Sequence, residues 1–212
     1  MIEYSVSDHR VLKFFSNQDV FSPSNIDLGA LAMLKQVQLK KGDLLLDLGC
    51  GYGFVGIYAA ETVEEQNITM VDISKQAIDL DKKNALKNGY TKISIIQSDG
   101  LDDVNQNGFN WILSNPPYHV DFSVPKKFIY QSYEKLAIGG KLVMVTKRRE
   151  WYKNKLISVF GGVTIYEVDG YFVFTAQKKA IEKENNKEVK RNRLSKKLAR
   201  KNEIKKRRKS LG

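Results

Sequence analysis

The chain has 212 residues, of which 42% are hydrophobic, enough for one globular domain with a full core. Its uncharged apolar stretches are far shorter than the roughly 20 residues of a membrane span, which argues against a membrane-embedded protein. The segment Met1–Ser5 lacks the basic-then-apolar order of an export signal, and the single cysteine, Cys50, cannot form an internal disulfide. We therefore expect a cytoplasmic protein.

The net charge of +11 is concentrated in one terminal segment. Residues 178–212 contain 16 of the 35 Lys and Arg residues and four of the 24 acidic residues, whereas residues 1–177 contain 19 and 20. The segment has few aliphatic side chains and no aromatic one, so it cannot bury enough surface to offset its ordering entropy. We expect a disordered or conditionally helical tail that either aids solubility or contacts nucleic-acid phosphates.

Predicted strands and helices alternate through the rest of the chain. We expect strands at 44–48, 68–73, 93–97, 109–114 and 141–146, and helices at 54–63, 75–88, 126–137 and 149–160. Two further strands, 163–168 and 171–176, flank the hairpin turn Asp169-Gly170. Strands separated by helices imply a mainly parallel, Rossmann-like α/β sheet of seven strands, which the hairpin closes with an antiparallel strand. The expected domains are an irregular leading extension, 1–41, that covers the substrate side, the α/β domain, 42–177, and the tail, 178–212.

Three alternate glycines follow the first predicted strand, in Asp47-Leu48-Gly49-Cys50-Gly51-Tyr52-Gly53. Glycine adopts positive φ without steric penalty and lets a backbone approach a ligand closely. A turn of this kind between a strand and a helix forms a cleft at the carboxyl end of the strand, although an ordinary tight turn has the same glycines. We therefore treat Asp47, Gly49, Cys50, Gly51 and Gly53 as candidate cofactor-binding residues.

Acidic residues end the next two predicted strands. Asp72, followed by Ile73, stands 25 positions after Asp47, where a carboxylate can accept hydrogen bonds from ribose hydroxyls. Ser98 and Asp99 end the third strand, in a position to meet a purine amine. Two more acids, Asp79 and Asp81, fall on a charged helix and are interpreted as solvated surface.

The glycine turn also fits a dinucleotide fingerprint, Gly-x-Gly-x-x-Gly, at residues 51–56. However, Asp47 and Gly49 precede that pattern, and an acidic residue at the entry suits a ligand with a cationic amino group better than a phosphate. This favours S-adenosylmethionine as the cofactor.

The sequence Asn115-Pro116-Pro117-Tyr118 follows the fourth predicted strand. Two prolines fix φ and remove two backbone donors, so the corner is stiff and its carbonyls are available as acceptors. An NH2 group could donate to the Asn115 side chain and to the Pro116 carbonyl, which would aim its lone pair at an electrophile, while Tyr118 stacks on the planar group. His119 is either a proton acceptor or a positioning residue.

These motifs resemble the class I S-adenosylmethionine-dependent methyltransferases, over nearly all of residues 40–177. In that family the glycine turn lines the methionine end of the cofactor, the second acid holds the ribose, and the third lies near adenine. The Asn-Pro-Pro-Tyr motif implies methylation of a planar nitrogen, in adenine, guanine or glutamine. The resemblance therefore implies a catalytic corner at residues 115–118, of which Asn115 is also a candidate cofactor-binding residue.

The leading segment resembles that of the ribosomal RNA guanine-N2 methyltransferases of the small-subunit type. The likeness rests on Phe21-Ser22, on Asp27-Leu28-Gly29 and on His119 after the corner. It implies that Phe21, Asp27, Tyr118 and His119 contact the substrate, although Phe21 has equal reason to pack in the core. Tyr118 stands where Phe is commoner in this group, and the chain has one methyltransferase domain where some relatives have a degenerate second copy.

We therefore expect a methyltransferase that acts on an exocyclic amine of RNA, most simply guanine N2 of ribosomal RNA, with RNA or a ribosomal subunit as partner. The alternatives are a glutamine methyltransferase acting on a translation factor, an adenine-N6 nucleic-acid methyltransferase, and a non-catalytic RNA-binding protein. Lys147-Arg148-Arg149, together with Trp151 and Tyr152, is either a basic, stacking surface for RNA or a solvated helix start.

Overall fold

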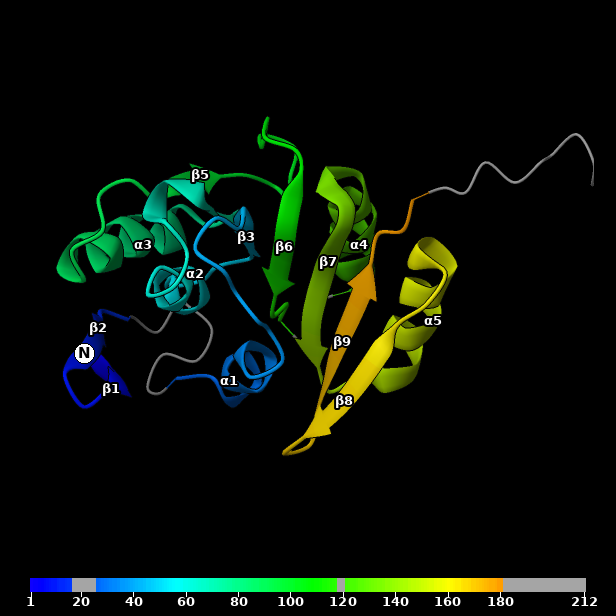
Figure 1. The fold of residues 1–212 in the computed structure, drawn as a ribbon, viewed down its shortest axis with the longest axis horizontal. Coiled ribbons are helices and arrows are strands. Elements are labelled where there is room, and N and C mark those ends of the chain that lie inside the picture. The colour runs from blue at the N-terminus through cyan, green and yellow to red at the C-terminus, as the bar shows by residue number, and fades with distance from the viewer. Residues whose placement is uncertain (17–25, 118–120, 181–212) are drawn as a thin grey trace, which may run out of the picture. The chain divides into compact units, whose positions relative to one another are not determined.

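The core of the protein is a mixed β-sheet whose strands follow one another in the order β5-β4-β3-β6-β7-β9-β8 (Figure 1). The computed structural model describes residues 1–16, 26–117 and 121–180. In this part of the chain the sheet has seven strands: β3 (Leu45–Leu48), β4 (Ile68–Asp72), β5 (Ser94–Gln97), β6 (Phe109–Ser114), β7 (Leu136–Thr146), β8 (Thr164–Val168) and β9 (Tyr171–Gln177). Strands β3 to β7 are parallel, and β9 is antiparallel to both β7 and β8. The predicted Rossmann-like sheet with an antiparallel hairpin is confirmed.

Helices cover both faces of this sheet. One face packs against α1 (Leu28–Leu34), α2 (Phe54–Ala59) and α3 (Lys75–Lys87), and the other against α4 (Ser123–Lys135) and α5 (Arg149–Phe160). A single 3-10 turn, η1 (Glu65–Asn67), precedes β4. All four residues of β3 are buried, as expected for a strand covered on both faces. In the described part of the chain, no helix is long and apolar enough to cross a membrane.

The N-terminal segment is more regular than the sequence indicated. It forms an antiparallel hairpin, β1 (Ile2–Ser7) and β2 (Arg10–Phe14), followed later by α1. The rings of Tyr4 and Phe14 contact Phe54 edge-on, with centroids 5.3 and 5.5 Å away, so the hairpin packs on α2. The expectation of an irregular segment was wrong, because it overlooked the strand pattern in which Ile2, Tyr4 and Val6 alternate with polar residues.

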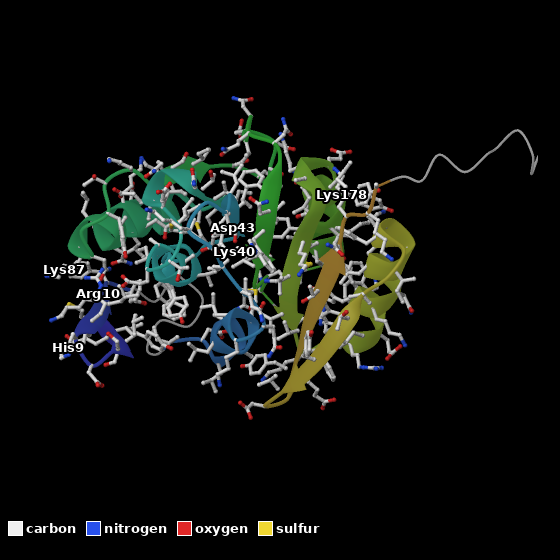
Figure 2. All side chains as sticks on the ribbon, in the orientation of Figure 1. His9, Arg10, Lys40, Asp43, Lys87 and Lys178 are labelled. Atoms are coloured by element: carbon white, nitrogen blue, oxygen red, sulfur yellow. The ribbon has the colours of Figure 1, made fainter. Side chains whose placement is uncertain are left out.

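Asn84 of α3 and Asn88, the C-cap of this helix, bind the backbone at the free edge of β2. Asn84 Oδ1 accepts from the Phe15 amide and its Nδ2 donates to the Phe15 carbonyl, at 2.7 and 2.9 Å. Asn88, one helical turn later, forms the same pair of bonds with the backbone of Lys13, both at 2.9 Å. Each side-chain amide thus replaces a neighbouring strand. Arg10 extends from the hairpin toward the same end of α3, beside Lys87 in Figure 2, and donates to the Asn88 carbonyl at 3.0 Å.

The boundary between α4 and β7 also differs from the prediction. The helix ends at Lys135 and β7 begins at once, so Gly139 and Gly140 lie inside the strand. Backbone bonds explain this: the Gly139 amide donates to the Lys178 carbonyl, and the Lys178 amide donates to the Gly140 carbonyl. The helix is therefore ended by strand pairing and not by the glycines.

Candidate active site

A cavity of about 490 Å³ opens at the carboxyl edge of the sheet, where β3, β4, β5 and β6 end. This is the point at which the strand order reverses, since β4 lies on one side of β3 and β6 on the other. The cavity receives these residues proposed from the sequence: Asp27, Asp47, Gly49, Cys50, Gly51, Asp72, Ile73, Ser98, Asp99, Asn115 and Pro117. Segments separated by up to 90 positions thus meet in one site.

The glycine turn between β3 and α2 is held by the neighbouring strand. The amides of Gly49 and Cys50 both donate to the Val71 carbonyl, at 2.9 and 3.0 Å, and the Gly51 amide donates to Asp72 Oδ2 at 3.0 Å. Gly49, Gly51 and Gly53 all have positive φ. At Gly53 glycine is also needed for space, because a Cβ there would lie 2.7 Å from the nearest side-chain atoms.

Asp47 is a buried acid at the base of the turn. Its Oδ2 accepts a 2.9 Å hydrogen bond from the Gly56 amide in the first turn of α2. Burial raises the pKa of Asp47 to about 7; the Gly56 bond lowers this pKa and the charge of Asp72 raises it further. Near neutral pH this carboxyl can therefore be protonated or ionised, and a cation placed beside it would favour ionisation.

A second buried acid, Asp81, lies beneath the same turn. The prediction that it belongs to a solvated surface was wrong for Asp81, which is fully buried, and right for Asp79, which is exposed. The Cys50 thiol donates to Asp81 Oδ2 at 2.8 Å, and a Cβ on Gly53 would lie 2.7 Å from Asp81 Oδ1. Burial raises the pKa of Asp81 well above its usual value, as it does the pKa of the Cys50 thiol. Asp81 of α3 can be buried because Gly53, which has no Cβ, leaves room for its side chain.

The acids that end β4 and β5 have different surroundings. Asp72 binds two backbone amides, those of Gly51 and Ser74, through its two oxygens. Each carboxylate oxygen has a second lone pair, so further donors can be accepted. The Asp99 side chain is 63% exposed and pairs with Lys127 Nζ at 2.7 Å, while Ser98 is buried. Asp99 lines the cavity, and its carboxylate forms an ion pair with Lys127 of α4.

Asn115 follows β6 and is bound by a residue from the N-terminal segment. Its Nδ2 donates to Asp27 Oδ1 at 2.7 Å. The same oxygen accepts from the Ala30 amide at 2.8 Å, as the N-cap of α1, so it is an acceptor and the amide end that meets it must be NH2. The Asn115 carbonyl oxygen therefore lies on the other side of the amide group. Pro116 is buried and outside the lining, whereas Pro117 is exposed and lines the cavity.

Some predicted site residues are not among the described residues that line the cavity. Gly53 does not line the cavity, although it shapes the turn beside it. Phe21, Tyr118 and His119 lie outside the described residues. Their proposed contacts with a substrate stay predictions.

The cavity also has an apolar wall that the sequence reasoning missed. It includes Ala30, Tyr52, Phe54, Val55, Ala77, Val124 and Phe128. Phe128 Cε2 lies 3.6 Å from the position of a Cβ on Gly49, so the aromatic ring packs against the turn. The sequence predicted a helix that begins at residue 126, whereas α4 begins at Ser123, so Val124 lay outside the predicted helix. The apolar spacing of 124, 128 and 129 is the signal that would have identified this wall.

The strand order, the glycine turn and the acidic strand ends together define a Rossmann-like protein of the class I methyltransferase type. A family model supports this: the model of the methyltransferase small domain matches residues 11–175. The chain belongs to this family.

Similar proteins include YbxB, an uncharacterized protein of Bacillus subtilis, which is 31% identical over 78% of this chain and 85% of its own length. Ribosomal RNA large subunit methyltransferase G of Photobacterium profundum is 29% identical, over 80% of this chain and 47% of its own. Ribosomal RNA small subunit methyltransferase C of Pseudoalteromonas atlantica is 30% identical, over 82% and 52%. The chain thus spans about half the length of these two ribosomal RNA methyltransferases.

Among solved structures, a T. thermophilus 16S rRNA N2 guanine methyltransferase in complex with AdoMet and guanosine superimposes with a TM-score of 0.70. Its sequence is 26% identical, and the match covers 76% of this chain and 45% of that one. A ribosomal protein L11 methylase from Lactobacillus delbrueckii, 18% identical with a TM-score of 0.60, shows the shared fold alone.

Proposed function

We propose that this protein transfers a methyl group from S-adenosylmethionine to the exocyclic N2 amine of a guanine in ribosomal RNA. The observation that carries the proposal is the fixed amide of Asn115, which presents an acceptor beside a cavity lined by the glycine turn and acidic residues. The relatives named as ribosomal RNA methyltransferases support the substrate class.

The cavity suits this cofactor in size and in chemistry. A volume of about 490 Å³ falls within the roughly 300–1,000 Å³ of small-molecule sites. Asp47 offers a buried carboxyl to the cationic amino group, and Asp72 offers lone pairs to the ribose hydroxyls. Val71, Ala77 and Ile73 supply an apolar surface for the purine.

The chain's contribution to catalysis is to orient the acceptor nitrogen. The cofactor supplies a sulfonium methyl group: the nitrogen forms the new C–N bond as the S–CH3 bond breaks, and it then loses a proton to water. Asn115 Oδ1 and the Pro116 carbonyl would each accept one hydrogen of the amine, which aims the nitrogen lone pair. Asp27 keeps the Asn115 amide in the orientation that this requires.

The two terminal segments are assigned roles from the same reasoning. Asp27 and Ala30 line the cavity, which supports the proposal that residues 1–41 form part of the substrate side. The tail, 178–212, carries 16 basic residues and is proposed to bind RNA phosphates.

The test is methylation of unmodified transcripts of both ribosomal RNA subunits by the full-length protein with labelled cofactor. Nucleoside mass spectrometry should identify N2-methylguanosine. Asn115→Ala should bind the cofactor as the natural protein does and lose on the order of 10²-fold in methyl transfer. Label in N6-methyladenosine, or in a translation factor added to the assay, would refute the guanine assignment, and full activity of Asn115→Ala would refute the role of the corner.

A further inference from the structure

Three consecutive cations leave the end of β7 beside the candidate active site. Lys147, Arg148 and Arg149 follow the last residue of β7, which is parallel to β6. Ser114, directly before the catalytic corner, is paired with Met144. Adjacent strands are about 4.8 Å apart, so these cations emerge on the same sheet edge as Asn115, one strand away.

Each of these cations lies over a different aromatic ring. Lys147 Nζ lies 4.8 Å from the Tyr171 ring centroid, and Arg149 Cζ lies 5.9 Å from that of Phe172. The contacts come from the closing hairpin, which thus supports two of the three side chains. Their positions are therefore set by the fold and not by solvent alone.

Arg148 completes a stack of planar groups. Its Cζ lies 5.0 Å from the centroid of Phe122, and Phe122 stacks on Trp151 with centroids 4.4 Å apart and planes 19° from parallel. Phe122 is 36% exposed and Arg148 is exposed. We call Phe122, Lys147, Arg148, Arg149 and Trp151 the cation–aromatic cluster.

The placement of these charges opposes the stability of the helix that follows. Arg148 is the N-cap of α5 and Arg149 is its first residue, where the helix dipole disfavours cations. Arg148 provides no side-chain cap, and the nearby acid Glu150 pairs with Arg149. Residues 1–177 are close to neutral as a whole, so a local excess of cations here points to an anionic partner.

We propose that the cation–aromatic cluster binds the RNA strand next to the target nucleotide. Lys147 and Arg149 contact phosphates, and the planar guanidinium of Arg148, supported by Phe122 and Trp151, stacks on an unpaired neighbouring base. A base that is methylated at the corner must leave its stack, which exposes a face of its neighbour. The inference rests on the proposed RNA substrate, and it adds where and how the RNA is held.

Trp151 allows a local test, because the chain has two tryptophans and the other, Trp111, can be replaced. In full-length Trp111→Phe protein, fluorescence reports Trp151 alone. A single-stranded 20-nucleotide RNA of mixed sequence should quench this fluorescence, and the same RNA as a duplex should quench it much less. Saturating RNA that leaves the Trp151 signal unchanged would overturn the proposal.

Charge variants test the cations against a matched control. Lys147→Glu/Arg149→Glu removes the two proposed phosphate contacts, so it should weaken single-strand affinity roughly tenfold or more and reduce the salt slope by about 1.4. Lys82→Glu/Lys83→Glu makes the same charge change on exposed residues of α3, across the sheet, and should alter the affinity less than twofold. Equal weakening by the two pairs would reduce the effect to net charge and overturn the proposal.

Arg148→Lys separates stacking from charge, since lysine keeps the cation and loses the planar face. It should keep the salt slope and lose several-fold in affinity. Binding and methyl transfer are measured separately: natural protein that binds RNA through the cluster and methylates none would refute the proposed function alone. Charge variants that bind and methylate RNA normally would refute the cluster alone.

Discussion

Asp47 should make cofactor binding release a proton. In the empty site, burial raises the pKa of Asp47 from 3.8 to about 7, so at pH 6 roughly nine-tenths of the molecules carry the proton. A cationic amino group beside the carboxyl favours its ionised form. A free α-amino group, with a pKa of about 7.7–8.0, is itself protonated at pH 6, so the released proton comes from the carboxyl.

The size of the effect follows from the pKa difference. A shift of about three units corresponds to roughly 4 kcal/mol between the protonated and ionised forms of Asp47 in the empty fold. Cofactor affinity should therefore rise close to tenfold per pH unit below pH 7, level off between pH 7 and about 8, and fall at higher pH as the free amino group loses its proton. The stability of the empty protein changes in the opposite sense: folded Asp47 keeps its proton above pH 4 and the unfolded chain does not, so stability falls between about pH 4 and 7.

Calorimetry in two buffers of different ionisation enthalpy measures the protons released. We expect close to one proton released per cofactor at pH 6. At pH 8 Asp47 releases only about a tenth of a proton, while about half of the free amino groups must take one up to bind as the cation, so the balance changes to net uptake. Asp47→Asn keeps an oxygen for the Gly56 amide and should release none. Equal proton release by Asp47→Asn and the natural protein would refute the assignment of this carboxyl to the amino group.

Three further predictions concern the corner, the turn and the tail. Asp27→Ser keeps a helix cap but its side chain is too short to reach Asn115, so it should lower methyl transfer about as much as Asn115→Ala does. Asp27→Asn should keep methyl transfer near normal. Additive losses of activity in Asp27→Ser/Asn115→Ala would show that the two residues act separately. Gly53→Ala should lower the free energy of unfolding in urea by about 2–4 kcal/mol, because it combines a φ of 86° with a 2.7 Å contact. Gly89→Ala, with a φ of 89° and open space around its Cβ, should lower it by about 1–2 kcal/mol. Equal losses would exclude the contact as the cause. Deleting 178–212 should weaken RNA affinity and flatten its salt dependence, and an unchanged slope would remove the tail from the RNA interface.

The sheet was predictable because its strands are marked locally. A continuous apolar run identified β3, and Asp169-Gly170, both with positive φ, identified the turn between β8 and β9. The helix–strand boundary at Lys135 was not predictable in this way, since it depends on pairing with Lys178, more than 40 residues away. The first strand of the N-terminal hairpin was visible in the alternation of Ile2, Tyr4 and Val6 with polar residues. The attachment of the hairpin to Asn84 and Asn88 depends on packing that no local pattern reveals.

In the candidate site, too, some residues were predictable from the sequence and others were not. The turn and the acids at the strand ends stand at motif spacing, so the sequence places them in one cavity. The bond between Asp27 and Asn115 spans 88 positions, and only the packing of α1 against the sheet brings the two together. Asp81 was misjudged because its neighbours in sequence are charged and exposed, while the space it occupies is created by Gly53 on another element.

Glycines give the turn after β3 a flexible backbone, but contacts with acidic residues of neighbouring elements hold the turn in place. The amides of Gly51 and Gly56 bind Asp72 and Asp47, and the Cys50 thiol binds Asp81. Three carboxyls around one turn would repel one another if all were charged, and burial avoids this by raising the pKa of two of them, Asp47 and Asp81. Of the two, Asp47 lines the cavity and Asp81 does not. A cation entering the cavity would therefore favour ionisation of Asp47, the carboxyl that it meets, which couples the charge of the site to its occupancy.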